Sequence, residues 1–205
     1  MYVARILYPV QVLGPGRRLG LWLSGCTRAC PGCSNPELWI PKSEQHIAPH
    51  ALIALIRRMA AEHPLDGLTI TGGEPFDQCA ELAQVLEAVS DITDDVLIYT
   101  GNTLAELHAR RCPDTDAVLA RTAVLIDGPY LQERNTGLPL RGSDNQHIHY
   151  LLPDVKPAYE AFLQADPGIQ NFTLGSSIVS VGIHHADYAD ALPDYAARKG
   201  LIPHD

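Results

Sequence analysis

The chain has 205 residues, of which 46% are apolar, and this length and composition fit a single domain with one sizeable core. Its 15 basic and 24 acidic residues give a formal net charge of −9, which argues against a nucleic-acid-binding protein with a broad basic surface. No apolar run approaches the roughly 20 residues of a membrane-spanning helix, and the amino-terminal residues lack a secretory signal pattern. We therefore expect a cytoplasmic protein that binds neither nucleic acid nor membrane.

The first third of the chain predicts two strands and a helix. Residues Val3 to Tyr8 alternate weakly between apolar and polar types, which is typical of an opening or edge strand. Leu19 to Ser24 is mostly apolar and predicts a buried strand that leads directly into Gly25 and Cys26. Between Ile47 and Glu62 the apolar residues recur at helical spacing, so we expect a helix that covers the sheet.

The middle of the chain repeats the order strand, turn and helix. Three short apolar runs predict strands: Leu68 to Thr71, Val96 to Tyr99 and Val124 to Ile126. Apolar residues from Leu82 to Val89 have helical spacing, and Thr103 to Glu106 has the pattern of a capping box at the start of another helix. This alternation predicts parallel strands with helices over the sheet, as in a complete or partial (β/α) barrel.

The pattern changes beyond Tyr150. Three short elements are expected there: a helix over residues 157–164, a hairpin formed by residues 171–174 and 177–181 around a turn at Gly175-Ser176, and a helix through residues 195–199. A segment this short is smaller than an ordinary domain. We therefore interpret residues 151–205 as an accessory segment packed on a core domain of residues 1–150.

Three of the five cysteines lie within eight residues. Cys26, Cys30 and Cys33 are close enough to face one inorganic centre, and an odd total favours a metal site in a reducing compartment over a disulfide framework. Cys79 and Cys112 stand apart, and we interpret them as small, partly buried apolar side chains. The cluster lacks a fourth cysteine nearby, which predicts a centre with one coordination position open to a group that is not protein.

Two kinds of centre suit three clustered thiolates. Structural zinc takes four protein ligands, and His46 or His50 would have to complete the set although both lie well beyond the cysteine loop. An iron–sulfur cluster with an open vertex needs no such ligand. Both remain alternatives on the cysteines alone, and the zinc alternative would describe an interaction module without enzymatic activity.

A second motif, Gly72-Gly73-Glu74-Pro75, follows the strand predicted at residues 68–71. The two glycines remove side chains where a ligand could approach the backbone, and Glu74 supplies an acceptor for an ammonium group. In barrel-like sheets this carboxyl end of the strands is where active sites lie. A plain tight turn into a helix is the simpler interpretation of a Gly-Gly pair that stands by itself.

The pair of motifs resembles the signature of the radical S-adenosylmethionine superfamily. The resemblance implies that Cys26, Cys30 and Cys33 hold one 4Fe-4S cluster and that S-adenosylmethionine chelates the remaining iron, with its amino group received by residues 72–75. It also implies a partial (β/α) barrel of radical S-adenosylmethionine type with a short C-terminal accessory segment. The implied reaction is reductive cleavage of S-adenosylmethionine to a 5′-deoxyadenosyl radical, which abstracts a hydrogen atom from the substrate.

Further residues are similar to the activating proteins of anaerobic ribonucleotide reductases: Gly32, Trp39, Gln78, Asp127-Gly128-Pro129-Tyr130 and Arg141 to Gln146. This resemblance implies that the partner is a glycyl-radical enzyme, an anaerobic ribonucleotide reductase. It also implies an electron donor that is a small protein such as flavodoxin or ferredoxin. The alternative within enzymes is a radical S-adenosylmethionine protein that modifies another peptide or a small molecule, for which the unmatched tail beyond Tyr150 is the main support.

The same resemblance implies contacts with the cofactor for several polar residues. Thr100 and Asn102 would bond the ribose or the methionine carboxylate, Asp127 would orient cofactor or partner, and Asn145 and Gln146 would bond the adenine. Each also has a local interpretation, because turns and loops use such side chains to satisfy their own backbone groups. Arg28 is expected to be solvated. Four histidines are interpreted as non-ligands: His147, His149, His184 and His185.

Overall fold

The computed structural model of the chain describes residues 1–174, 177–184 and 188. Its strands are β1 (Val3–Val10), β2 (Arg18–Leu23), β3 (Gly67–Gly72), β4 (Val96–Tyr99), β5 (Val124–Asp127), β6 (His147–Tyr150), β7 (Gln170–Leu174) and β8 (Ser177–Val181). Its α-helices are α1 (Pro49–Glu62), α2 (Cys79–Ala88), α3 (Leu104–Ala109), α4 (Pro113–Ala120) and α5 (Lys156–Gln164). The described residues also form the short 3-10 helices η1 (Pro36–Leu38), η2 (Ser43–Gln45), η3 (Pro75–Gln78), η4 (Gln132–Arg134) and η5 (Pro153–Val155).

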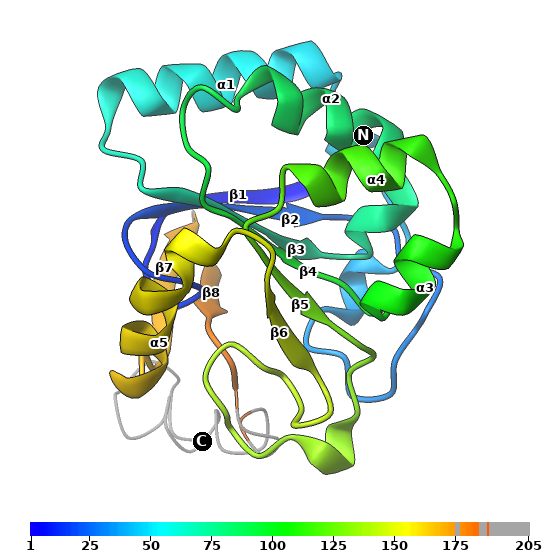
Figure 1. Cartoon of the computed structure of the whole chain (residues 1–205), viewed down its shortest axis with the longest axis vertical. Coiled ribbons are helices and arrows are strands. Elements are labelled where there is room, and N and C mark those ends of the chain that lie inside the picture. Colours follow the sequence, from blue (N-terminus) through cyan, green and yellow to red (C-terminus); the bar gives the residue numbers. More distant parts are fainter. Residues whose placement is uncertain (175–176, 185–187, 189–205) are drawn as a thin grey trace, which may run out of the picture.

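The fold is mixed α/β, built on a mostly parallel six-stranded sheet (Figure 1). The strands follow chain order from β1 to β6, and β2, β3, β4 and β5 pair in parallel as the alternation of strands and helices predicts. The edge strands β1 and β6 pair antiparallel to their neighbours. The sheet is therefore open, with its two ends formed by β1 and β6.

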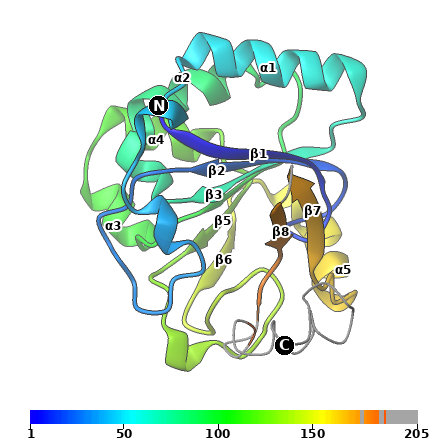
Figure 2. The ribbon, with the colours of Figure 1, turned by 180° about the vertical axis from the view of Figure 1, so that it is seen from behind.

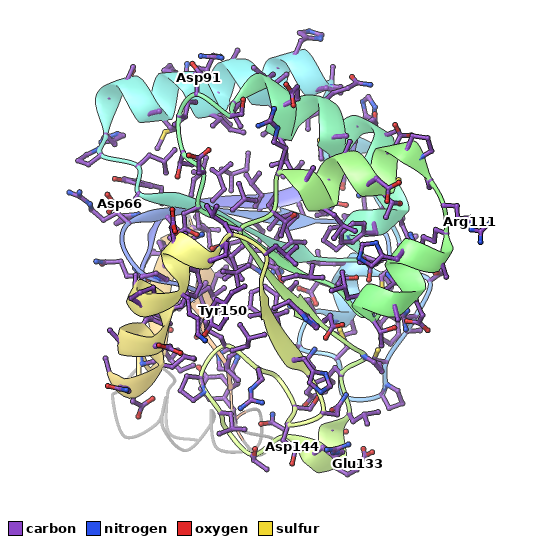
Figure 3. All side chains as sticks on the ribbon, in the orientation of Figure 1. Asp66, Asp91, Arg111, Glu133, Asp144 and Tyr150 are labelled. Atoms are coloured by element: carbon purple, nitrogen blue, oxygen red, sulfur yellow. The ribbon has the colours of Figure 1, made fainter. Side chains whose placement is uncertain are left out.

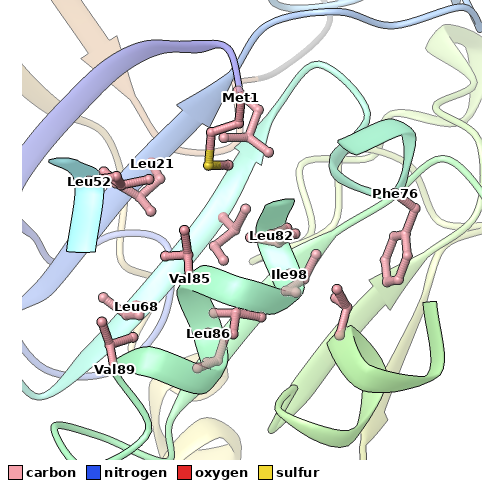
Figure 4. Close-up of a cluster of buried hydrophobic side chains, with 14 of the residues drawn as sticks. Met1, Leu21, Leu52, Leu68, Phe76, Leu82, Val85, Leu86, Val89 and Ile98 are labelled. Carbon is pink, nitrogen blue, oxygen red and sulfur yellow. The ribbon is translucent and has the colours of Figure 1, made fainter. Parts of the chain in front are cut away.

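Helices α1, α2 and α4 cover one face of the sheet (Figure 1). The apolar face predicted for α1 is only partly buried. Leu52 and Ile56 are fully buried, whereas the other residues of this face are only partly covered. They pack with Leu21, Leu68 and Leu86 in the main core, which Figure 4 shows in close-up. Each such side chain contributes about 1.5–3 kcal/mol when it is fully buried.

The hairpin β7–β8 and helix α5 lie on the other face, as the view from behind shows (Figure 2). Val181 of the hairpin packs in a cluster with Trp22, and Tyr159 of α5 packs in a separate cluster with Ile126. Strand β2 is buried along its whole length because both faces of the sheet are covered there. The expected turn at residues 175–176 and the expected helix at residues 195–199 lie outside the described residues.

A buried ion pair fixes the amino ends of the parallel strands. The Arg18 guanidinium is fully buried and donates to both carboxylate oxygens of Asp95, at 2.7 and 3.1 Å, and to Thr69 Oγ1 at 2.7 Å. The Tyr159 hydroxyl donates to the same carboxylate at 2.7 Å and so ties α5 to the sheet. Breaking such a pair is costly because it leaves one buried charge without its partner.

Two elements were not predicted from the sequence, and a third extends beyond its predicted end. Helix α4 and strand β6 were not predicted, because α4 is short and weakly amphipathic, and β6 reads His-Ile-His-Tyr with its side chains only partly buried or exposed. Strand β1 also continues through Pro9 to Val10, beyond its predicted end. Among the described residues, no helix is long and apolar enough to cross a membrane.

Candidate functional site

The carboxyl ends of the parallel strands surround one cavity of about 220 Å³. Strand β2 leads into the cysteine loop, β3 into Gly73 and Glu74, β4 into Thr100 and Gly101, and β5 into Gly128. All of these segments line the cavity, because the ends of parallel strands meet at one edge of the sheet. The two motifs that the sequence singled out therefore share one site.

The cysteine loop begins at the tip of β2 and is closed by backbone hydrogen bonds. Gly25 N donates to Leu38 O at 2.8 Å, and Cys26 N donates to Trp39 O at 3.0 Å, so the loop returns to its starting point. The three sequence-predicted ligands, Cys26, Cys30 and Cys33, are free thiols that line the cavity together.

The structure of this loop explains why residue 32 is a glycine. Its φ of +69° lies in the left-handed region, and a Cβ atom at this position would overlap with the Gln132 side chain of η4. A larger residue before Cys33 would therefore strain the backbone and push the Gln132 side chain aside. The glycine that narrowed the sequence resemblance is therefore favoured by the backbone conformation and by the position of Gln132.

The thiols have environments that suit a metal cluster. Burial raises the pKa of the Cys26 thiol, and a bound metal centre would compensate the charge of its thiolate form. Asn35 N donates to Cys33 Sγ at 3.4 Å, which orients that sulfur. Within the described residues, no fourth cysteine lines the cavity. The donor set thus fits a cluster held by three thiolates, with one position facing the cavity.

Gly72 and Gly73 join the end of β3 to the end of β2. Gly73 N donates to Leu23 O and Glu74 N donates to Gly25 O, both at 2.8 Å. A Cβ atom on either glycine would overlap with backbone atoms of β2 or of Gly25, and Gly72 has a φ of +101°. The chain's own backbone therefore approaches both glycines closely, and this contact fixes the cysteine loop against the second motif.

Glu74 links the ends of β3 and β4 through its side chain. Its carboxylate is 2% exposed and accepts hydrogen bonds from Phe76 N at 3.0 Å, Thr100 Oγ1 at 2.8 Å and Gly101 N at 2.9 Å. Burial raises the pKa of this carboxyl group, and the three donors partly oppose that shift. Glu74 thus lines the cavity, but its carboxylate accepts most of its hydrogen bonds from groups of the protein itself.

Arg28 is held inside the site, contrary to the expectation of a solvated side chain. It is 27% exposed, it donates to Asn102 Oδ1 at 2.7 Å, and its Nε lies 3.9 Å from Glu74 Oε2. Asn102 Oδ1 also accepts from Arg110 at 2.8 Å, and Asn102 Nδ2 donates to Thr100 Oγ1 at 3.1 Å. The polar residues after β4 therefore position a guanidinium group at the cavity wall.

Asp127 and Asn145 lie next to the cavity but do not line it. Asp127 Oδ2 accepts from Leu104 N at 2.6 Å and lies 3.0 Å from His149 Nε2. Asn145 Nδ2 donates to Pro129 O at 2.8 Å, whereas the neighbouring Gln146 lines the cavity and donates to Gly128 O at 2.9 Å. His149 gains a carboxylate neighbour that the sequence did not reveal, because β6 was not predicted. Pro75 is buried at the start of η3, behind Glu74.

The hairpin supplies a wall of the cavity that sequence reasoning missed. Residues 179–184 line it together with the strand ends, and His184 is among them. Burial lowers the pKa of His184, so its neutral form is favoured. Asn135 Nδ2 donates to the His184 carbonyl oxygen at 2.9 Å and connects this wall to the segment after η4. No motif marks these residues, so the sequence carries no signal for their role.

The chain is similar in sequence to one protein family and to several known proteins. Residues 12–149 match the family model described as a 4Fe-4S single cluster domain. The chain is 36% identical over 152 residues to the anaerobic ribonucleoside-triphosphate reductase-activating protein of Vibrio cholerae, an alignment that covers 69% of this chain and 94% of that protein. It is 32% identical over 152 residues to the protein of the same name from Escherichia coli K12, with 70% and 96% covered. The corresponding values for Pasteurella multocida are 36% over 159 residues, with 69% and 93% covered.

Proposed function

Because this chain belongs to the family of anaerobic ribonucleoside-triphosphate reductase-activating proteins, we propose that it activates such a reductase by generating a glycyl radical on it. One observation supports this proposal most strongly: Cys26, Cys30 and Cys33 line the same cavity as Gly72, Gly73 and Glu74. A cluster held by the three thiolates would then face the residues proposed to receive S-adenosylmethionine.

The 4Fe-4S cluster and S-adenosylmethionine would supply the one-electron chemistry for hydrogen abstraction. The chain's own contribution is to bind and orient these two groups and to shield them from water. We propose that the backbone from Gly72 to Pro75 receives the amino group of S-adenosylmethionine. Arg28, held by Asn102 and close to Glu74, is suited to an anionic group such as a carboxylate.

Four polar residues have supporting roles in this proposal. Thr100 and Asn102 act through Glu74 and Arg28, to which they are hydrogen-bonded. Asp127 and Asn145 lie outside the cavity lining, so we propose that they position the loops that contact the cofactor. Gln146 is better placed than Asn145 for direct contact with the cofactor, because it lines the cavity.

We also propose that the open sheet is a partial (β/α) barrel of radical S-adenosylmethionine type, formed by residues 1–150, with residues 151–205 as its accessory segment. The position of the cavity at the carboxyl ends of the parallel strands supports this assignment. The electron must come from outside the chain, and we propose a small donor such as flavodoxin or ferredoxin. The free thiols suit the reducing cytoplasm.

A second candidate, hydrogen abstraction from another peptide or a small molecule, is favoured by the hairpin. Residues 179–184 line the cavity although they follow the last residue of the 12–149 family match. A substrate-contacting wall that differs from the relatives would alter specificity without altering the cofactor chemistry. The zinc-binding module lacks comparable support, because the cysteine loop lies inside the matched 4Fe-4S domain.

The test is anaerobic reconstitution followed by two assays. We expect a brown protein with about four irons per chain that cleaves S-adenosylmethionine under reduction, and a glycyl-radical doublet in the electron paramagnetic resonance spectrum after the cognate reductase is added. A colourless protein with one zinc ion would refute the cofactor assignment. Cleavage without the doublet would refute the reductase as substrate and favour the second candidate.

A further inference from the structure

Cys79 and Cys112 lie together although 33 positions separate them in the sequence. Cys79 is the first residue of α2, and Cys112 is the N-cap of α4, two helices that pack against each other on one face of the sheet (Figure 1). Their sulfur atoms and the Asp114 carboxylate lie within 4.8 Å of one another. Both cysteines are partly exposed, so they are accessible to small reagents rather than enclosed core residues.

The two thiols differ in their surroundings. The backbone N–H of Thr115, in the first turn of α4, is the main group that lowers the pKa of Cys112, and the N–H of Asp114 adds to this effect. Burial raises the pKa of Cys79. A thiolate attacks a disulfide whereas a thiol does not, so Cys112 has the character of an attacking residue and Cys79 that of a second, resolving residue.

We propose that Cys79 and Cys112 form a thiol pair that small-molecule disulfides convert reversibly into an internal disulfide. In the first step the Cys112 thiolate attacks one sulfur of the reagent, whose S–S bond breaks to give a mixed disulfide and one released thiolate. Cys79 then loses its proton to solvent and attacks the Cys112 sulfur, which releases the second thiolate. In total, two protein thiols are oxidised and one reagent disulfide is reduced to two thiols.

The position of the pair connects it to the cavity. Gln78, the residue before Cys79, donates through Nε2 to Ser24 O at 3.0 Å, at the tip of the strand that leads into the cysteine loop. Arg110, two residues before Cys112, donates to Phe76 O at 3.1 Å and to Asn102 Oδ1 at 2.8 Å. The link between Arg110 and Cys112 lies at the molecular surface, where Arg111 projects outward (Figure 3). A disulfide would thus join two segments whose hydrogen bonds support residues near the cavity.

A metal site is the competing interpretation of the same three side chains. Structural zinc takes four protein ligands, whereas this group offers two sulfurs and the carboxylate of Asp114, an exposed residue. The close approach of the two sulfurs is also what disulfide formation requires. The pair therefore fits thiol exchange better than metal binding.

The test uses the reconstituted holoprotein under anaerobic conditions, with oxidised glutathione as the reagent. We expect the intact mass to fall by two hydrogens, peptide mapping to show one Cys79–Cys112 link, and the cluster absorption to stay unchanged. In Cys79→Ala, glutathione should remain attached to Cys112. In Cys112→Ala, Cys79 should react about tenfold or more slowly than Cys112 does in the companion variant, because its thiol is less ionised.

Three results would overturn the proposal. The first is a wild-type protein that carries glutathione on either cysteine without an internal link, and the second is the same reaction rate in both variants. The third is one zinc ion per chain that is lost in both variants and prevents oxidation of the wild type. The readouts are masses and metal content, and they require no reductase. Failure of this proposal is therefore distinguishable from failure of the proposed function.

Discussion

Gly73→Ala should separate the two motifs of the cavity. The new Cβ atom would lie 2.9 Å from the carbonyl carbon of Gly25 and closer still to its oxygen, so the tips of β2 and β3 must move apart. That movement breaks or lengthens the bonds from Gly73 N to Leu23 O and from Glu74 N to Gly25 O. Overpacking costs about 1–3 kcal/mol, and one buried group left unsatisfied costs about 1–3 kcal/mol. We expect the free energy of unfolding to fall by about 2–6 kcal/mol.

The assay is urea denaturation of the cluster-free protein, combined with iron content after anaerobic reconstitution. Gly101→Ala is the matched control, because Gly101 lines the same cavity but the atoms nearest to its new Cβ atom all belong to the Arg28 side chain, which can move. The control should lose less than about 1 kcal/mol and keep its iron, whereas Gly73→Ala should lose iron as well as stability. Equal stability and equal iron content in the two variants would refute the reasoning.

Three other variants test separate parts of the structure. Cys33→Ala should abolish iron incorporation and cofactor cleavage together, while Cys112→Ala retains both; cleavage by Cys33→Ala would remove that residue from the ligand set. Asp95→Ala should lower the free energy of unfolding by about 3–5 kcal/mol in urea, because Arg18 is left buried without its partner; a loss below about 1 kcal/mol would contradict that account. Burial raises the pKa of Glu74, so its contribution to stability is present below the ordinary value of 4.5 and is lost as the pH rises through the folded-state pKa. Stability measured against pH should show this decline in the wild type and not in Glu74→Gln, and identical curves would refute the shift.

Local patterns were sufficient to predict the elements that carry the site. The run from Leu19 to Ser24 is buried on both faces, so its continuous apolar character predicts β2 directly. The capping box at Thr103 is present, with Thr103 N donating to Glu106 Oε2 at 2.7 Å and Glu106 N donating to Thr103 Oγ1 at 3.2 Å. These features depend on neighbours in the sequence, which is why the sequence was enough to predict them.

Contacts between segments that are distant in the sequence could not be predicted from such local patterns. Strand β6 has alternating polar side chains at an edge, so hydrophobic periodicity does not detect it, and the approach of His149 to Asp127 stays hidden with it. The proximity of Cys79 to Cys112 depends on how α2 packs against α4. The glycines at 72 and 73 were recognised as a close approach, but only the register of β2 against β3 identifies the group that approaches.

The hairpin wall has a consequence for the order in which the site is assembled. Synthesis proceeds from the amino end, so the three cysteines and all six strands of the main sheet are made before residues 179–184. Until those residues fold against Trp22 and its neighbours, the cavity lacks one side. The three cysteines are therefore synthesised before the residues that close this side of the cavity.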